Sequence, residues 1–332
     1  LTLHTFKRVR HIGTGSSSRV YLFELATEAE IRKLKPSKVL TLELPEGEKP
    51  PMHVCRKRYF NEQTTPRNWD ALEQGKHRSA VNWRKGQGET ETSQESMLNE
   101  SSPCLPLHDN LIHIYRSTRE HMIYDYCEST LDQYCSQSSS CSVTHHKQAN
   151  AKGLSDLTNS CTSCRNFNLR RKKDLMMQIL RGVSFLHSHG WIHRDLKPSN
   201  IFIAGQGTVK IGDFDLIERE HHTLNIGSQT PVQTLNFQAL EILFGATHYG
   251  APVDMWSLGG IFFEIFTEGR YLFDAEGQIA QMMQIFDLLG EPNDKNWPQM
   301  KSYKNAARFT FSGKDTLKQR IEEESESLVN DG

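Results

Sequence analysis

The start of the chain alternates hydrophobic and polar positions with the period of β-strands. β-Branched, aromatic and leucine residues recur in VRHIG, RVYLFEL, KVLTLEL and MHVCRKRYF. Because successive side chains of a strand point to opposite faces, this alternation predicts three or four strands between Phe6 and Val54. The chain therefore begins with a small β-rich region.

Strand-like segments continue after a polar interruption. Residues 61–94 are polar and contain glycine, and the helix-like segment ESMLNE follows them. HDNLIHIYRS and HMIYDYC then have the composition of strands. We expect 61–94 to be a surface insertion. Residues 135–166 have few apolar residues and no periodicity, which predicts a loop.

After this loop the hydrophobic period becomes that of an α-helix. Leu175, Ile179, Val183 and Leu186 fall on one helical face, and Gly190 is expected to follow the end of the helix. VDMWSLGGIFFEIF and GQIAQMMQIFDLLG predict two further helices. The pattern therefore predicts an α+β protein in which a β-rich lobe precedes a larger helical lobe.

Composition and charge narrow the classes of partner. The 332 residues carry 39 basic and 40 acidic side chains, so the strongly basic surface that nucleic-acid phosphates favour is not expected. The longest apolar stretch, near GGIFFEIF, contains Glu264 and is far shorter than the roughly 20 residues that span a bilayer. We expect neither a membrane span nor direct nucleic-acid binding.

Seven cysteines occur in a chain whose first residues, LTLHTFKRVR, lack the apolar region of a signal peptide. Reduced thiols in a cytoplasmic or nuclear protein are therefore expected rather than a disulfide framework. Cys161 and Cys164 form a CxxC pair, which a zinc site would also require. The serine-rich, apolar-poor surroundings favour a plain loop over zinc binding.

The first candidate for chemistry is the turn IGTGSSSRVY between two predicted strands. Gly13 and Gly15 would let backbone amides approach a polyphosphate that a Cβ would obstruct. Ile12 and Val20 flank the turn, and Val20 stands where an apolar side chain could cover a base. An ordinary hairpin also accommodates two glycines, so this motif alone is weak.

A lysine on the following strand is the second candidate. Lys57, in VCRK, stands where an ammonium could reach the α- and β-phosphates of a nucleotide. Glu95 in QESMLNE could pair with that ammonium from a helix, while Glu91 and Glu100 are alternatives. A lysine on a strand is more often simply solvated.

The strongest motif is HRDLKPSN, residues 193–200. Asp195 can accept a proton from an attacking hydroxyl, Lys197 can neutralise a transferring phosphoryl group, and Asn200 can hold Mg²⁺. Asp213 follows a predicted hairpin, IFIAGQGTVKIG, and supplies a second oxygen ligand of the type that Mg²⁺ prefers.

Taken in order, IGTGSSSRV, VCRK, HRDLKPSN, DFD and ALE at 239–241 resemble the signature set of eukaryotic protein kinases, and the match runs from about residue 6 to 312. The resemblance implies a bilobal protein kinase fold with an N-lobe at 6–127 that contains the insertion 61–94. It implies a C-lobe at 128–332 that contains the polar insertion 135–166. Since relatives continue well beyond FTFSGKD, the C-lobe is expected to be incomplete.

The resemblance also implies that ATP and Mg²⁺ are used, and it assigns roles to particular residues. The catalytic set is Asp195, Lys197 and Thr234. Asn200 and Asp213 are the metal ligands. The nucleotide-binding set is Ile12, Gly13, Gly15, Val20, Lys57, Glu95 and two hinge residues after Tyr124, namely Asp125 and Cys127.

Within the family, the segment from TPVQTLNFQALE to TEGRYLF resembles cyclin-dependent kinases, and FGA, YG and VDMW are closest to the kinases that activate them. The lysine of HRDLK resembles the serine/threonine-specific class. These likenesses imply a protein substrate and a role in cell-cycle or transcription control. They leave a cyclin or cyclin-like activator open.

Several positions depart from the family pattern. Asp215 replaces the usual glycine of Asp-Phe-Gly, which is expected to reduce the freedom of the turn but not to abolish chemistry. Gln238 replaces an arginine and leaves a Ser/Thr-Pro preference open. Glu218 replaces another arginine, so Arg194 is the clear cation for a phosphorylated loop. Glu241 is expected to lack an arginine partner.

Two alternatives to a protein kinase remain open at this level. The departures at Asp215 and Gln238 are compatible with a catalytically weak pseudokinase that acts as a binding module. A small-molecule kinase on the same fold is the other alternative. The long segment from Asp213 to Glu241 suits a protein substrate better.

Overall fold

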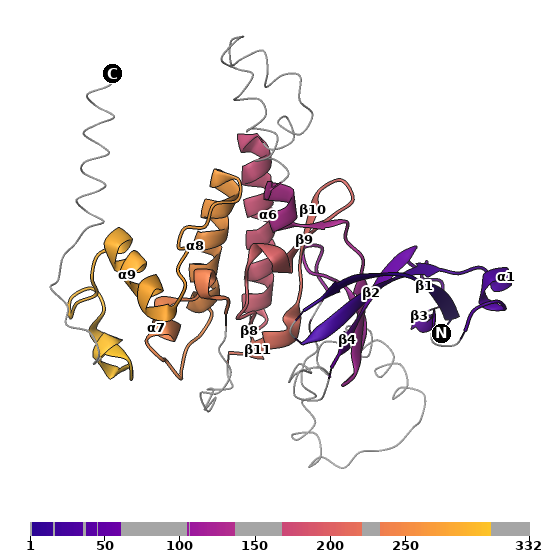
Figure 1. Cartoon of the computed structure of the whole chain (residues 1–332), viewed down its shortest axis with the longest axis horizontal. Coiled ribbons are helices and arrows are strands. Elements are labelled where there is room, and N and C mark those ends of the chain that lie inside the picture. The colour runs from indigo at the N-terminus through magenta and orange to yellow at the C-terminus, as the bar shows by residue number, and fades with distance from the viewer. Residues whose placement is uncertain are drawn as a thin grey trace, which may run out of the picture. The chain divides into compact units, whose positions relative to one another are not determined.

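The computed structural model describes residues 2–15, 17–35, 38–44, 46–60, 105, 107–136, 168–220 and 233–306 (Figure 1). The chain forms two compact units, and each is described by itself. The first comprises Leu1–Thr130, Gln178–Phe185 and Phe202–Ile217, and the second comprises Leu131–Met177, Leu186–Ile201 and Glu218–Gly332. The domain boundaries expected from the sequence stay a prediction, and the insertion at 61–94 lies outside the described residues.

A six-stranded antiparallel sheet forms most of the first unit, with strand order β3-β1-β2-β4-β6-β5. This confirms the strands predicted from the alternating pattern. Their bounds are β1 Thr2–Thr14, β2 Ser18–Leu25, β3 Val39–Leu44, β4 His53–Tyr59, β5 Ile114–Ser117 and β6 His121–Asp125.

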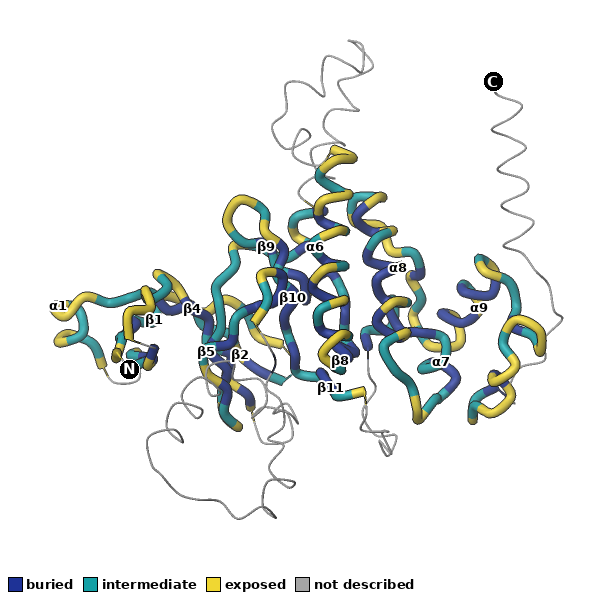
Figure 2. The backbone as a smooth tube through the Cα atoms, turned by 180° about the vertical axis from the view of Figure 1, so that it is seen from behind, coloured by how far each residue is buried: buried dark blue, intermediate teal, exposed yellow. Residues whose placement is uncertain are grey.

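The strand β3 lies at one edge of this sheet, after the short helix α1, Glu28–Ile31. It pairs with the first half of β1, where Phe6 lies opposite Leu40. Every second residue of β3 is buried, and the side chains pack with Phe6 and Phe23 in one hydrophobic cluster. The period of two in VLTLEL therefore places one face of β3 in the core. Buried positions along β4 of the same sheet are visible in Figure 2.

The first unit also contains a three-stranded sheet of β7 Ser129–Thr130, β9 Ile201–Ala204 and β10 Thr208–Ile211. The strands β9 and β10 are the hairpin predicted from IFIAGQGTVKIG. The side chain of Asn110 donates a hydrogen bond to Val209 O at 3.0 Å, and Gln178 Oε1 accepts one from the Val209 amide at 2.9 Å. These side chains satisfy backbone groups at the outer strand, as burial requires.

The long helix predicted from the 3.6-residue period is α6, Leu169–Ser188. Asn168 caps its first turn, since Asn168 Oδ1 accepts a hydrogen bond from the Arg171 amide at 2.9 Å. The four residues predicted to share a face are at most 1% exposed. Gly190 follows the helix with φ +72°, a conformation that favours glycine.

Helical segments dominate the described part of the second unit. The helices α8, Pro252–Thr267, and α9, Gln278–Leu289, correspond to the two predicted helices. The short elements are β8 Trp191–Ile192, η3 Pro198–Asn200, β11 Glu218–Arg219, η5 Leu235–Phe237, α7 Leu240–Leu243 and η6 Pro298–Ser302. The loop predicted at 135–166 is wrong at its start, because residues 135–136 continue a helical segment from Leu131 and Cys135 is buried there. The rest of that predicted loop, 137–166, lies outside the described residues.

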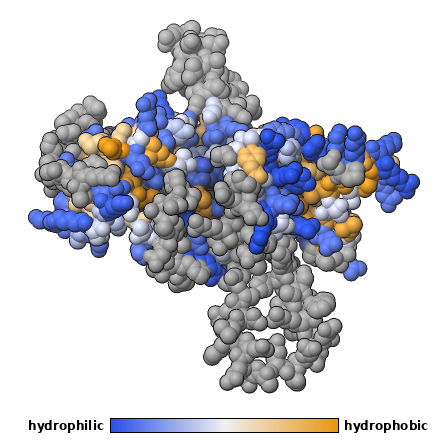
Figure 3. All heavy atoms as spheres, turned by 60° about the horizontal axis from the view of Figure 1, so that its bottom comes forward, coloured by the Kyte–Doolittle hydropathy of each residue, from blue (hydrophilic) through white to orange (hydrophobic). Residues whose placement is uncertain are grey.

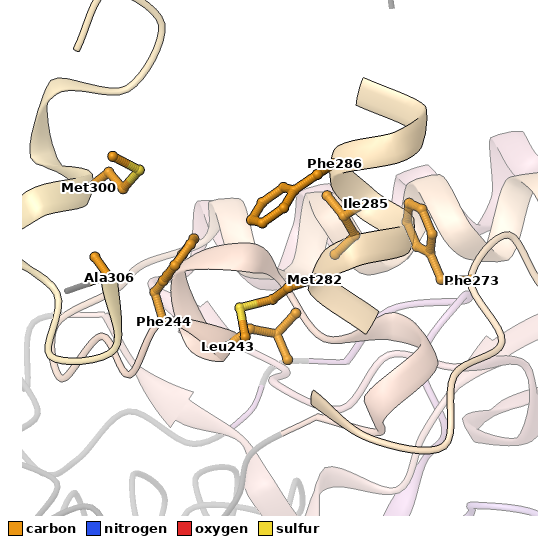
Figure 4. Close-up of a cluster of buried hydrophobic side chains, with 8 residues drawn as sticks. All are labelled: Leu243, Phe244, Phe273, Met282, Ile285, Phe286, Met300 and Ala306. Carbon is orange, nitrogen blue, oxygen red and sulfur yellow. The ribbon is translucent and has the colours of Figure 1, made fainter. Parts of the chain in front are cut away.

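A hydrophobic cluster joins α7, α9 and the segment after α9. Figure 4 shows the side chains of this cluster directed toward one another. Phe244, the residue that follows α7, faces α9. The rings of Phe244 and Phe286 stack at 6.3 Å, and Trp297 meets Phe244 edge-on at 5.6 Å. Aromatic burial of this kind contributes strongly to stability. The cluster comprises Leu243, Phe244, Phe273, Met282, Ile285, Phe286, Met300 and Ala306.

Hydrophilic residues cover much of the molecular face seen in Figure 3, with smaller hydrophobic areas between them. Among the described helices, none has the length and apolar character needed to cross a bilayer. Cys55, Cys127 and Cys135 are free thiols, while Cys161 and Cys164 lie outside the described residues.

Candidate active site

Lys57 lies on β4 in register with Val20 of β2 and Met122 of β6. Its ammonium donates hydrogen bonds to Asp213 Oδ1 and to Asp215 Oδ2, both at 2.6 Å. The side chain is only 10% exposed. The first unit therefore places the predicted phosphate-contacting lysine against the predicted metal ligand Asp213.

The backbone of the Asp-Phe-Asp turn is set at Asp213, whose φ is +62° and ψ is +61°. Aspartate tolerates this left-handed region better than most residues. The residue before it approaches other segments closely, since a Cβ at Gly212 would lie 2.9 Å from an Ile112 methyl carbon. Phe214 is fully buried and begins the short helix η4, Phe214–Leu216.

Asp215 occupies the glycine position of this turn within η4. Among the described residues, the non-glycine residues with positive φ include Asp213 but not Asp215. The glycine replacement therefore introduces no left-handed strain at position 215. It instead adds a carboxylate beside Lys57.

Tyr59 completes the contacts of Asp215. The Tyr59 hydroxyl donates to Asp215 Oδ1 at 2.9 Å, while Lys57 binds Oδ2 of the same carboxylate. Lys57, Tyr59, Asp213 and Asp215 are named here the Lys57 cluster. Sequence reasoning missed Tyr59, although its position two residues after Lys57 on a strand predicts that both side chains share a face.

Burial and charge act in opposite directions within the Lys57 cluster. Burial opposes the charge on Lys57, but Asp213 and Asp215 outweigh it and raise the pKa of the ammonium. Burial raises the pKa of the Asp215 carboxyl, and Lys57 opposes that rise. Burial and then the nearby Asp215 raise the pKa of the Tyr59 hydroxyl, which keeps it a donor.

The glycine-containing turn lies between β1 and β2. Gly13 is opposite Val20 in the strand register, and the Gly15 amide donates to Ser18 O at 2.9 Å. A Cβ added at Gly13 or Gly15 would meet no described atom within 4 Å. Ile12 is 40% exposed. The turn therefore leaves space around both glycines among the described residues.

The two predicted hinge residues follow Tyr124. The Asp125 carboxylate accepts a hydrogen bond from the Tyr115 hydroxyl at 2.8 Å and lies 3.5 Å from Lys210 Nζ. Burial raises the pKa of Cys127 to about 12, so its thiol stays protonated near neutral pH. Glu95, the predicted partner of Lys57, lies outside the described residues.

In the second unit, the carboxylate of Asp195 is surrounded by hydrogen-bond donors. Oδ2 accepts from Lys197 Nζ at 2.8 Å and from Asn200 Nδ2 at 3.0 Å. Oδ1 accepts from the amide and the hydroxyl of Thr234 at 3.1 and 3.0 Å. Asp195, Lys197, Asn200 and Thr234 are named here the Asp195 cluster. The structure therefore brings together these four predicted site residues.

Lys197 and Asn200 each make a second contact in this cluster. Lys197 Nζ donates to Thr234 Oγ1 at 2.9 Å, and Asn200 Nδ2 donates to Asp195 O at 2.8 Å. Because Asn200 contacts Asp195 through its amide nitrogen, its amide oxygen is the atom suited to a cation. Asn200 belongs to the second unit and Asp213 to the first, so their shared metal site stays a prediction.

Asp254 supports the loop that carries Asp195. Its two carboxylate oxygens accept hydrogen bonds from the His193 and Arg194 amides at 2.8 and 2.9 Å. His187 Nε2 lies 2.8 Å from the same carboxylate. These bonds brace the backbone of the loop, where Arg194 has φ +66°.

A family model described as the protein kinase domain matches residues 73–329, which is most of the chain. The chain belongs to the protein kinase family. The matched range contains the Asp195 cluster and Asp213 but not Lys57 or the glycine turn, so the roles of those residues depend on their motifs.

The similar curated proteins are cyclin-dependent kinases. Probable cyclin-dependent kinase 10 of Dictyostelium discoideum is 41% identical over 144 residues, 43% of this chain and 38% of the relative. Cyclin-dependent kinase B2-1 of Arabidopsis thaliana is 35% identical over 167 residues, 50% of this chain and 53% of the relative. The chain thus spans about half or less of the length of these kinases. The finer resemblance to kinases that activate cyclin-dependent kinases stays a prediction.

A solved structure shows the same fold. The yeast RNA Pol II CTD kinase CTDK-1 complex contains a chain that matches 95% of this chain and 81% of its own length, with a TM-score of 0.56 and 20% identity. The kinase fold is therefore bilobal, with a β-rich N-lobe represented by the six-stranded sheet and a helical C-lobe represented by α8 and α9.

Arg194 of the kinase has acidic and phenolic neighbours. Its guanidinium donates to the Tyr249 hydroxyl at 3.3 Å and lies 3.9 Å from Glu218 Oε2, with both charged side chains less than 10% exposed. The sequence suggested Arg194 as the cation for a phosphorylated loop, and the structure places a carboxylate beside it. Ser228 and Thr230, the residues of this loop at which phosphorylation is expected, lie outside the described residues.

Gln233 is a second residue that sequence reasoning missed. It is 8% exposed with φ +66°, and its amide group donates to Val253 O and Ser257 Oγ at 3.0 and 2.9 Å. Its oxygen accepts from the Ala239 amide at 2.9 Å. Gln233 therefore anchors the segment that carries Thr234. No local sequence signal distinguishes it from an exposed loop glutamine.

Partial burial of the Glu241 carboxyl group raises the pKa of this group. In the parts of the chain that the structure describes, the ion pairs do not include Glu241. Gln238, the other departure from the family pattern in this region, is 3% exposed. Its backbone N–H donates a hydrogen bond to Leu235 O at 3.1 Å.

Proposed function

We propose that this kinase transfers the γ-phosphoryl group of ATP to serine or threonine hydroxyls of a protein substrate. The arrangement of donors around Asp195 supports the proposal most directly. A carboxylate held by Lys197, Asn200 and Thr234 is oriented as an acceptor for one further proton. This is the chemistry that a general base for a hydroxyl nucleophile requires.

The other residues of the site bind and orient. Lys197 lies beside the base and would neutralise charge that develops on the transferring group. Lys57 would contact the phosphates, with Glu95 as its proposed helical partner. Ile12, Gly13, Gly15 and Val20 would enclose the nucleotide, and Asp125 and Cys127 would line the adenine side.

Mg²⁺ fits the donor set that the proposal gives it. Asp213 supplies carboxylate oxygens and Asn200 an amide oxygen, which are the ligand types that this hard cation prefers. When bound, Mg²⁺ would offset the charge of the phosphates. Each of these two residues is held by its own unit, Asp213 by Lys57 and Asn200 by Asp195.

The partners of this kinase are inferred from the relatives that it resembles. Similarity to cyclin-dependent kinases supports a protein substrate and a cyclin or cyclin-like activator. A role in cell-cycle or transcription control is proposed on the same basis. A cytoplasmic or nuclear location is proposed from the reduced thiols that the cysteine content suggests. A non-catalytic binding module is the second candidate, favoured by the two carboxylates that occupy Lys57.

Transfer of radiolabelled phosphate from ATP to a generic basic protein tests the proposal. We expect wild type to label the substrate, and we expect Asp195→Ala and Asp213→Ala each to reduce the rate by about a thousandfold, as loss of a base or a metal ligand does. Asp294→Asn serves as the control, because Asp294 forms an exposed ion pair with Lys301. Equal labelling by all four proteins would exclude the enzyme and favour the binding module.

A further inference from the structure

The Lys57 cluster contains one carboxylate more than the metal site needs. Asp213 is the proposed metal ligand, yet Asp215 binds the same ammonium at the same distance of 2.6 Å. Asp215 also accepts the Tyr59 hydroxyl at 2.9 Å. Its two oxygens therefore connect two side chains of β4 to the turn.

These contacts are partly buried, which distinguishes them from an ordinary surface ion pair. The side chains of Lys57 and Asp215 are 10% and 20% exposed. By contrast, Asp294 and Lys301 also lie 2.6 Å apart, but their side chains are 65% and 70% exposed. An exposed pair contributes little, whereas a buried charged hydrogen bond restricts both partners.

Backbone conformation does not explain the aspartate. Position 215 lies in the helix η4, and the positive φ of the turn belongs to Asp213. The side chain, rather than the backbone, is therefore what distinguishes Asp215 from the glycine of the family.

We propose that Asp215 is a positioning residue for Lys57 and that it holds the ammonium toward the nucleotide phosphates. The inference rests on the proposed function, because it assumes that Lys57 contacts phosphate. An ammonium has three N–H donors. Among the described residues, Asp215 and Asp213 accept two of them, and the proposal assigns the third to a phosphate oxygen.

Asp215 would also keep Lys57 in place when Asp213 contacts a metal. A carboxylate that ligates Mg²⁺ is a weaker acceptor for an ammonium, and Lys57 would then depend on another anion. Asp215 is fixed by Tyr59 independently of Asp213. Asp215 therefore supplies, from the turn itself, an anchoring contact for Lys57 of the kind that the sequence predicts for Glu95.

A double-mutant cycle with Lys57→Met and Asp215→Asn tests the inference. Binding of a fluorescent ATP analogue in the presence of Mg²⁺ is measured for wild type, both single variants and the double variant. We expect Asp215→Asn to weaken binding about tenfold, the size of one lost charged hydrogen bond. In the Lys57→Met background the same change is expected to have less than a twofold effect, because Asp215 acts through Lys57.

Asn was chosen because it keeps the shape of aspartate, and Asp294→Asn is the matched control at an exposed pair of the same length. Thermal unfolding of each variant checks that it folds. If Asp215→Asn leaves the affinity unchanged, increases it, or weakens it equally in both backgrounds, the positioning role is wrong.

Steady-state kinetics separates this inference from the proposed function. We expect Asp215→Asn to raise the KM for ATP by a larger factor than it lowers kcat. If wild type binds the analogue with the expected coupling but transfers no phosphate, the catalytic proposal fails while the positioning role stands. If wild type transfers phosphate but the cycle is additive, only the positioning role fails.

Discussion

The Lys57 cluster and the Asp195 cluster have opposite charge arrangements. In the first, one cation is held by two carboxylates and those carboxylates come from a distant turn. In the second, one carboxylate is held by a lysine, an amide and a threonine. An excess of acceptors suits the binding of a cation, whereas an excess of donors orients a base and tolerates anionic substrate groups.

The two clusters also differ in how their members are connected. Asp195, Lys197 and Asn200 share one loop, and Asp254 fixes its backbone through the His193 and Arg194 amides. Lys57 and Asp215 are 158 positions apart in the chain. The Asp195 cluster is therefore largely a local structure, while the Lys57 cluster exists only in the folded unit.

The largest effect that would sharpen this comparison is expected at Lys197. Lys197→Met removes the cation beside Asp195 and Thr234, and we expect the rate of phosphate transfer to fall about a hundredfold, as for other charged transition-state contacts. Lys197→Arg keeps the charge and is expected to retain more activity. A decrease in kcat of less than threefold in Lys197→Met would contradict the proposed role of Lys197 as the cation of the Asp195 cluster.

A carboxylate outside both clusters, which forms no ion pair among the described residues, provides the next test. Glu264 of α8 is 3% exposed, and its Oε2 has no hydrogen-bond partner among the described residues. Burial and then Asp132 raise the pKa of Glu264 from 4.5 to about 7. The folded state then binds a proton that the unfolded state releases between these values, so stability falls as pH rises from about 4.5 to about 7.

Glu264→Gln should remove this dependence because the amide does not titrate. We expect the variant to gain about 2 kcal/mol in the free energy of unfolding at pH 8 relative to wild type, and little at pH 4. Urea unfolding at both pH values measures the difference. An equal change at the two pH values would mean that Glu264 does not change its protonation state between them.

The smallest effect is expected at Tyr59. Tyr59→Phe removes the hydroxyl that donates to Asp215 but keeps the ring near Lys57, whose ammonium lies 5.6 Å from the ring centroid. We expect a loss of about 1 kcal/mol in the free energy of unfolding, the usual cost of one hydrogen bond. Tyr21→Phe, on the same sheet, is the matched control. A loss no larger than that of the control would show that Asp215 is held by Lys57 alone.

Much of the fold could be predicted from the sequence. The alternating strands of the N-lobe and the helices α6, α8 and α9 follow from periodicity, because burial of one face imposes a period of two or 3.6. The edge position of β3 could not be predicted, since its pattern fits several pairings. The first half of β1 decides its place through the contacts of Phe6.

The residues of the candidate site likewise divide into those that the sequence identified and those that only the folded structure brought together. HRDLKPSN determined Asp195, Lys197 and Asn200 of the Asp195 cluster, because these residues share one loop. Thr234 and the supporting Asp254 reach that loop from distant parts of the chain. Gln233, the proximity of Glu218 to Arg194 and the binding of Lys57 by Asp215 and Tyr59 were decided by tertiary structure alone. The physical reason is that the hydrophobic period of a helix or strand shows which face a residue occupies. It does not show which distant charge lies opposite that face.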